Sequence, residues 1–151
     1  MIRIKNTQRT TTVNSNQLKK DAQKILDYLG YSDFDLGIWL TTNQTIQHYN
    51  ATYRKKNNPT DILSFPYHTD LIAGQLIRPK TTDDKNLGDI IMSPEYIQQA
   101  ATTLKISFNK RMRILLIHGI CHLLGYDHIK DKDYAIMQKK EDDLMEFLET
   151  E

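Results

Sequence analysis

The chain has a single cysteine and no long hydrophobic segment. Cys121 is the only cysteine among 151 residues, so no disulfide can form within the chain and the fold does not depend on an oxidising compartment. No apolar run approaches the roughly 18 residues that a transmembrane helix needs. The segment "MIRIKNTQRT" lacks the apolar stretch of a secretory signal. These absences predict a cytoplasmic protein without a membrane segment.

Neither sign of charge is in excess, because the formal net charge is only +1. The charges are nevertheless unevenly distributed. Residues 1–24 carry six basic side chains and one acid, Asp21, whereas residues 141–151 carry six acids and no base. Such a separation either steers a polyanion toward one face or reflects two solvated helix surfaces. The sequence leaves both interpretations open.

Composition and periodicity predict one α+β domain over residues 1–151. Hydrophobic residues make up 39% and charged residues 26%, as in globular proteins, and there is no repeat or linker. Alternating apolar positions predict a strand over residues 34–40, and short apolar segments predict strands over residues 2–6, 61–67 and 87–93. Helical spacing predicts helices over residues 16–29, 43–56, 93–105, 107–124 and from 131 onward. This order favours a small mixed β-sheet flanked by helices.

Local signals predict caps and inward positions within these elements. Asn43 is the expected N-cap of its helix, and Ser93 with Pro94 is a strong helix start. The residues of the last helix expected to face inward are Tyr134, Met137, Leu144 and Leu148. Tyr49, Tyr53 and Tyr67 are also expected to face the core, and this position is favoured over an exposed one in which their rings stack on a ligand. Residues 68–86 form a long connection, which indicates a functional flap or a mobile loop.

The segment "HGICHLLGYDH", from His118 to His128, carries the strongest chemical signal. His118 and His122 lie one helical turn apart, and Gly125 can reverse the chain so that His128 returns to them. Three neutral imidazoles leave one position of a tetrahedral Zn²⁺ open, as in catalytic zinc sites. We therefore predict a metzincin-like metal site holding one Zn²⁺ per chain. The alternative is that His118 and His122 make only hydrogen bonds in the core.

The residue after the first histidine is glycine, where zinc proteases with this spacing carry a glutamate base. Gly119 cannot accept a proton, so peptide hydrolysis by that route is disfavoured. Phosphodiester cleavage depends more on charge neutralisation and positioning. Arg54 is the candidate cation, because a guanidinium can bind a phosphate through two hydrogen bonds. The alternative for Arg54 is a surface cation at a helix C-terminus.

Four further residues are candidates for supporting roles. Asp127 either holds a ligand imidazole by a hydrogen bond or shapes the turn. Ser64 either contacts a phosphate oxygen or, as the pattern favours, bonds to backbone. Lys55 and Lys56 are candidate substrate contacts beside Arg54. Cys121 faces away from His122 on the helix and is expected to be a buried hydrophobe, not a ligand.

Three segments together resemble the signature blocks of the YbeY family of bacterial metal-dependent endoribonucleases. They are "NATYRKKNNPTDILSFP" (residues 50–66), "LGDI" (residues 87–90) and "HGICHLLGYDH" (residues 118–128). The resemblance implies an α/β/α fold, zinc bound by the three histidines, and a functional role for Arg54. It also implies maturation of the small-subunit ribosomal RNA 3′ end, ribosome quality control, and rRNA and small-subunit components as partners.

Two other functions remain open on the sequence. The ligand spacing is also compatible with a metal-dependent hydrolase of peptides or small amides, although the glutamate is absent. Alternatively, the chain is a non-enzymatic ribosome-assembly factor in which zinc is structural, and chelation would then unfold it. Asp89 has no chemical role that the sequence defines, and its expected role is structural, at a strand end.

Overall fold

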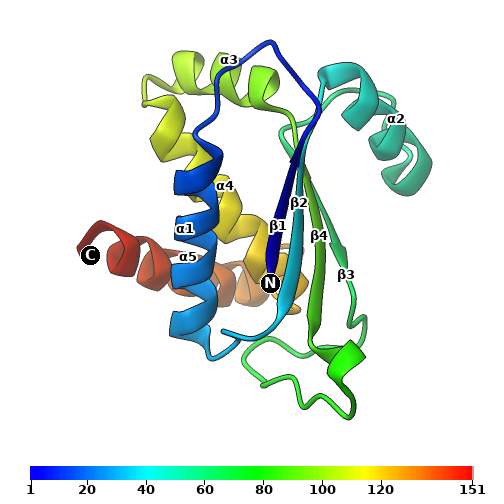
Figure 1. Cartoon of the computed structure of the whole chain (residues 1–151), viewed down its shortest axis with the longest axis vertical. Helices are drawn as coiled ribbons and strands as arrows, with labels where there is room; N and C mark the ends of the chain where they lie inside the picture. Colours follow the sequence, from blue (N-terminus) through cyan, green and yellow to red (C-terminus); the bar gives the residue numbers. More distant parts are fainter. Residues whose placement is uncertain (151) are drawn as a thin grey trace.

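A mixed four-stranded β-sheet divides the molecule, in a computed structural model that describes residues 1–150 (Figure 1). The strands are β1 (Ile2–Asn6), β2 (Asp35–Leu40), β3 (Ile62–Pro66) and β4 (Asn86–Met92). Their order in the sheet is β1-β2-β4-β3. β1, β2 and β4 are parallel, whereas β3 is antiparallel to β4 and lies at the edge, as Pro66 predicts.

Helices cover both faces of this sheet, but unequally. They are α1 (Ser15–Leu29), α2 (Asn43–Arg54), α3 (Pro94–Leu104), α4 (Phe108–Leu123) and α5 (Asp131–Thr150). α1, α3, α4 and α5 lie on one side, and α2 alone lies on the other (Figure 1). The predicted α+β class with an α/β/α arrangement is confirmed. Within residues 1–150, no helix has both the length and the apolar composition that crossing a bilayer requires.

The larger hydrophobic core lies between the sheet and the four-helix side. Alternation along β2 sends Leu36, Ile38 and Leu40 into this core, where they are at most 2% exposed. A smaller cluster on the opposite face joins Ile46 of α2 to Leu63 and Ile91. Because α2 covers only part of that face, the remaining outer surface of the sheet stays open.

Three local predictions differ from the structure. Thr42, and not Asn43, caps α2, with its hydroxyl accepting from the Thr45 N–H at 3.2 Å. Both residue types cap helices, so the sequence leaves the position uncertain by one residue. Tyr134 is 54% exposed, although the rest of its predicted stripe is buried. Tyr53 and Tyr67 are also exposed, because α2 and the end of β3 have no helix packed over them.

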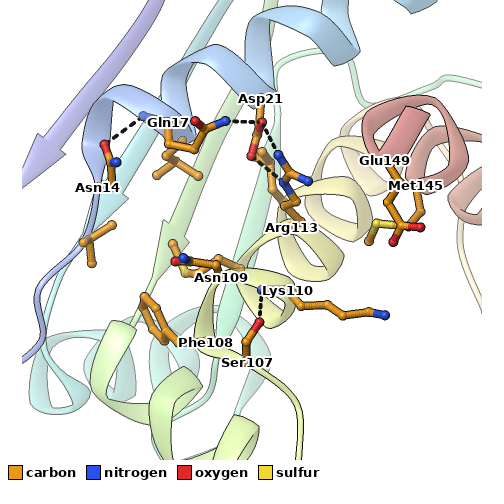
Figure 2. A pocket seen from close by; sticks show the side chains of 14 residues that line it. Asn14, Gln17, Asp21, Ser107, Phe108, Asn109, Lys110, Arg113, Met145 and Glu149 are labelled. Atoms are coloured by element: carbon orange, nitrogen blue, oxygen red, sulfur yellow. Dashed lines mark hydrogen bonds and ion pairs between the residues drawn. The ribbon is translucent and has the colours of Figure 1, made fainter. Parts of the chain in front are cut away.

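A buried ion pair fastens α1 to α4. Asp21 is 3% exposed and accepts from Arg113 Nε at 2.9 Å and Nη2 at 3.2 Å. Gln17 donates to the same carboxylate at 2.8 Å (Figure 2). Asp21, Gln17 and Arg113 all line a cavity of about 510 Å³ between α1 and α4. Asp21, the single acid of residues 1–24, thus has a structural role, because it joins α1 to α4.

The long connection over residues 68–86 is anchored at several points. Ile77 is buried, and its N–H donates to the Tyr31 hydroxyl at 3.1 Å. The ring of His68 bonds to the carbonyl of Asp84 at 2.8 Å. Leu71 packs so closely on Gly125 that a β-carbon there would lie 2.7 Å from the Leu71 carbonyl oxygen. The connection therefore supports the turn that carries the third histidine.

Candidate metal centre and its cleft

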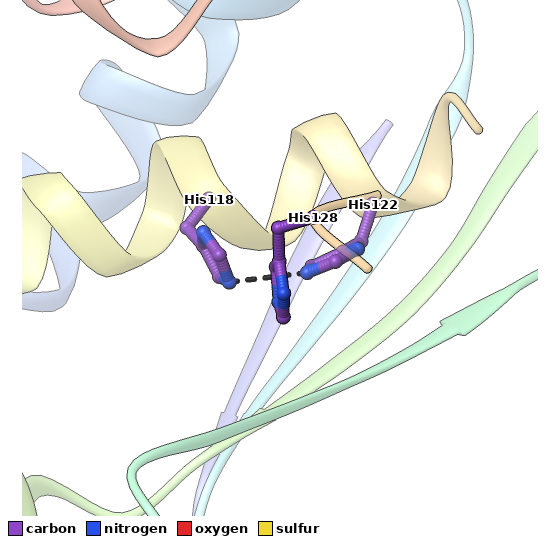
Figure 3. Close-up of side chains that lie close together, drawn as sticks. All are labelled: His118, His122 and His128. Atoms are coloured by element: carbon purple, nitrogen blue, oxygen red, sulfur yellow. Dashed lines mark hydrogen bonds between the residues drawn. The ribbon is translucent and has the colours of Figure 1, made fainter. Parts of the chain in front are cut away.

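The end of α4 and the turn after it bring the three histidines together. His118 and His122 lie on one face of α4, which ends at Leu123. Gly125 adopts φ 91°, a left-handed conformation that other residues rarely take, and the chain reverses there. One ring nitrogen from each of His118, His122 and His128 lies within 4.8 Å of the others (Figure 3). The three residues are placed as for a three-histidine site, and they could bind a metal ion.

Hydrogen bonds to the outer ring nitrogens fix the orientation of two imidazoles. His122 Nδ1 lies 3.0 Å from the Tyr126 carbonyl oxygen, which can only accept, so Nδ1 carries the proton. His118 Nδ1 lies 2.9 Å from Glu141 Oε2 and donates to this carboxylate. When Nδ1 carries the only proton of each ring, the Nε2 lone pair is free and directed into the site.

These two free lone pairs face each other across a short gap. His118 Nε2 and His122 Nε2 are 3.1 Å apart. Two acceptors at that distance repel unless a proton or a metal ion lies between them. Burial, and then the nearby charges of His118 and His128, lower the pKa of His122 to about 4. His122 is therefore neutral at neutral pH, and the arrangement fits a metal cation.

Glu141 is the functional residue that the sequence interpretation missed. It belongs to the acidic run that was assigned to charge steering or a solvated surface, yet it bonds directly to His118. The signal was present: Glu141 lies four residues after Met137 and three before Leu144, on the buried stripe of α5. A single carboxylate on an apolar stripe requires a polar partner. The Tyr126 contact uses a backbone carbonyl, which leaves no signal in the sequence.

Gly119 occupies the position at which zinc proteases with this histidine spacing carry a glutamate base, and its packing favours glycine there. The residue is buried, because α4 packs here on side chains of β3 and β4. A β-carbon on Gly119 would lie 2.8 Å from Ile62 Cδ1 and 3.0 Å from Ile90 Cδ1. The Ser64 hydroxyl also donates to the Gly119 carbonyl, at 3.4 Å. A side chain at this position would have to displace the ends of Ile62 and Ile90, so the site as packed has no room reserved for a base.

Introducing the missing glutamate is therefore expected to damage the fold. Gly119→Glu should lower the free energy of unfolding by about 3–5 kcal/mol, because it overpacks the contact and buries an unpaired carboxylate. Gly119→Ala should change it by no more than about 1 kcal/mol, since the gain in helix propensity offsets the displacement of two isoleucine methyl groups. Urea denaturation followed by circular dichroism measures both values. Equal stability of Gly119→Glu and wild type would contradict the close packing.

The histidines open into a cleft of about 800 Å³. Arg54, Ser64 and Asp127 line it, and so do Tyr53 and Tyr134, which explains why these two tyrosines are not in the core. Arg54 is exposed at the end of α2 and belongs to none of the ion pairs found among residues 1–150. Lys55 and Lys56 are exposed but do not line the cleft, because the chain turns away at Lys55, which adopts φ 61°.

Asp127 and Cys121 do not contact the imidazole nitrogens. The Asp127 carboxylate accepts from the Ile129 N–H at 3.2 Å, which is the turn-shaping role of the two that the sequence allowed. Carboxylate support for a ligand histidine comes from Glu141 instead. Cys121 is fully buried, and burial followed by the charge of Glu141 raises its pKa to about 12. Its thiol remains protonated and acts as a small hydrophobe.

The fold and the site together define an α+β protein with an open three-histidine centre in a cleft. The chain belongs to the Endoribonuclease YbeY family, whose model matches residues 3–149. The human protein named Endoribonuclease YbeY is 39% identical over 138 residues, covering 91% of this chain and 82% of its relative. The protein of the same name from Aquifex aeolicus is 37% identical, covering 78% and 72%. The resemblance of the three sequence blocks is thereby confirmed.

A solved structure has the same fold. The solution structure of TM1509 from Thermotoga maritima matches with a TM-score of 0.60 and 24% sequence identity. The match covers 99% of this chain and 93% of that protein. The arrangement of sheet and helices is thus found in a solved protein over nearly the whole length of both chains.

Proposed function

We propose that the chain is a zinc-dependent endoribonuclease that processes ribosomal RNA, with residues 1–151 forming a single metallohydrolase domain. The observation that carries this proposal is the convergence of three histidine nitrogens in a cleft that is also lined by Arg54, which is exposed and has no ion-pair partner within residues 1–150. Membership of the Endoribonuclease YbeY family supports RNA as the substrate. Glu151 belongs to this domain by sequence and lies outside the residues that the structure describes.

Zinc is the metal that suits this donor set best. Three neutral imidazoles without thiolates or clustered carboxylates favour a borderline ion over Mg²⁺ or Ca²⁺. The 3.1 Å between the His118 and His122 nitrogens is close to the spacing of about 3.3 Å expected for two ligands of one tetrahedral zinc ion. His128 is exposed and supplies the third nitrogen from the open side of the cleft.

The protein's own contribution to the reaction is positioning and charge. Arg54 neutralises the phosphate at the cleaved bond and orients it by two parallel hydrogen bonds. Glu141 and the Tyr126 carbonyl keep the Nε2 lone pairs of His118 and His122 turned toward the cleft. When bound, the metal supplies Lewis acidity and lowers the pKa of water. No protein carboxylate is needed as base, and the buried Gly119 leaves none available on α4.

The same family membership supports a proposal for the biological setting. We propose maturation of the small-subunit rRNA 3′ end and ribosome quality control as the processes, with small-subunit components as partners. This role places the protein in the cytoplasm, where ribosomes are assembled. Peptide or small-amide hydrolysis is the poorer alternative, because the position of the required glutamate is packed against Ile62 and Ile90.

The direct test is cleavage of RNA by the purified, zinc-loaded protein. We expect a structured small-subunit rRNA fragment to be cut, and a mixed peptide pool to remain intact. The ends of the products separate two routes: a 2′,3′-cyclic phosphate indicates attack by the ribose 2′-hydroxyl, and a 5′-phosphate indicates attack by water. Peptide cleavage without RNA cleavage would overturn the proposal.

Glu141 should matter for metal affinity without being a ligand. Glu141→Gln should weaken zinc binding about 10- to 100-fold, because an amide supports the His118 ring less strongly than a carboxylate does. Competition with a fluorescent zinc chelator measures this affinity. Asp142→Asn is the matched control, since Asp142 is exposed and bonds only to Gln138. An unchanged affinity in Glu141→Gln would contradict the orienting role.

A further inference from the structure

A second arginine lies in the cleft beside the histidines. Arg111, on α4, lines the same cleft as Arg54, His118 and His122. It precedes His118 by seven residues, close to two helical turns, so both side chains leave the same face of α4. The two positions are about 10 Å apart along the helix axis. A strand that passes the metal centre along α4 therefore reaches Arg111.

Arg111 is held weakly in its present position. Its one ion pair joins Nη2 to Asp61 Oδ2 at 3.5 Å, the limit of a hydrogen bond. Its Nε is buried and has no partner in the described chain. Arg113, two residues later on α4, is the internal comparison, because it binds Asp21 through two contacts of 2.9 and 3.2 Å. Within residues 1–150 the terminal nitrogens of Arg111 make only this one long hydrogen bond, so a stronger acceptor in the cleft can replace Asp61 as their partner.

Asp61 does not depend on Arg111 to stay in place. Its Oδ1 accepts from the Ile62 N–H at 2.7 Å and from the Thr60 hydroxyl at 3.4 Å. These contacts fix the carboxylate at the start of β3, inside the cleft. Asp61 consequently presents a negative group to the guanidinium in the way that a backbone phosphate would.

We propose that Arg111 binds a backbone phosphate of the RNA next to the cleaved bond, and that Asp61 competes with this phosphate for the guanidinium. The inference rests on the proposed function, since RNA is the polyanion concerned. Arg54 then contacts the scissile phosphate, and Arg111 holds the strand further along α4. A phosphate offers Arg111 two oxygens in place of a single contact at 3.5 Å. Arg111 is a substrate-binding residue, and Asp61 sets how tightly it binds.

The two residues give substitutions with opposite expected effects on RNA binding. Arg111→Gln should weaken binding of a short single-stranded RNA about 3- to 10-fold at low salt, and should reduce the slope of log affinity against log salt by about 0.7. Asp61→Asn keeps the Oδ1 acceptor and removes the charge, so it should tighten binding about threefold. A purely structural ion pair would lower stability in both variants and leave RNA affinity unchanged.

The measurement uses the full chain with a chelator present, so that the RNA is bound but not cut. Lys110→Gln is the matched control, because Lys110 adjoins Arg111, is exposed and does not line the cleft; its salt slope should stay near that of wild type. Failure of the wild type to bind RNA would count against the proposed function itself. Two results would overturn this inference alone, provided that the wild type binds RNA. One is a salt slope of Arg111→Gln equal to that of wild type, and the other is weaker RNA binding by Asp61→Asn. If Arg111→Gln does not fold, the RNA affinity of Asp61→Asn alone tests the inference.

Discussion

His122→Ala is expected to release the metal and to reduce RNA cleavage at least about 100-fold, since even residues that only support a ligand change affinity or activity by 10- to 100-fold. The substitution removes one of the two nitrogens that face each other at 3.1 Å. The remaining nitrogens come from His118 and from the exposed His128, which are too few to hold a catalytic zinc ion. Metal analysis by mass spectrometry, paired with an RNA-cleavage assay, measures both effects.

The fold should survive this loss, which separates a catalytic metal from a structural one. The main core is built by apolar residues of the sheet and of α1, α3, α4 and α5, and it does not include the histidines. We therefore expect a chelated wild type and His122→Ala to keep their circular dichroism spectra. His48→Ala, on the exposed side of α2, is the control and should retain metal and activity. If chelation unfolds the protein, the alternative of an assembly factor with structural zinc is favoured. If metal-free His122→Ala cleaves RNA at the wild-type rate, the three histidines are not the catalytic metal site.

Arg54→Ala should keep its metal and still lose about 2–4 kcal/mol of transition-state stabilisation, the amount typical of an electrostatic stabiliser. This corresponds to a fall in kcat/KM of about 30- to 1,000-fold. The structural reason is that Arg54 lines the cleft of the histidines and has no ion-pair partner in the described chain that would hold it elsewhere. Steady-state cleavage kinetics at constant zinc occupancy give the value.

Two neighbouring variants make this result specific. Lys56→Ala removes an equal charge outside the cleft and should leave kcat/KM within about twofold, because surface charges at a distance are screened by salt. Arg54→Lys should recover only part of the activity, since a lysine cannot make two parallel hydrogen bonds to a phosphate. If Arg54→Ala cleaves at the wild-type rate, Arg54 is only a favourable cation at the C-terminus of α2.

The local elements and the metal motif were predictable because their signals are short in range. Periodicity located the four strands and five α-helices of residues 1–150 to within a few residues, and the turn at Gly125 was expected because glycine readily adopts a positive φ. The errors were at positions where neighbouring residues can equally well cap a helix, or where the burial of a side chain depends on distant segments. Thr42 replaced Asn43 as a cap, and Tyr134 faces the cleft and not the core.

The sequence by itself determined the three-histidine motif, since the spacing along one helix places His118 and His122 on one face and a glycine turn allows His128 to return to them. Tertiary structure decided what surrounds them. Glu141, 23 residues beyond His118, becomes its partner only because α5 packs on α4. Gly119 excludes a base only because α4 meets β3 and β4 there. Contacts between distant segments depend on how whole elements pack, and no local pattern of residues encodes that packing.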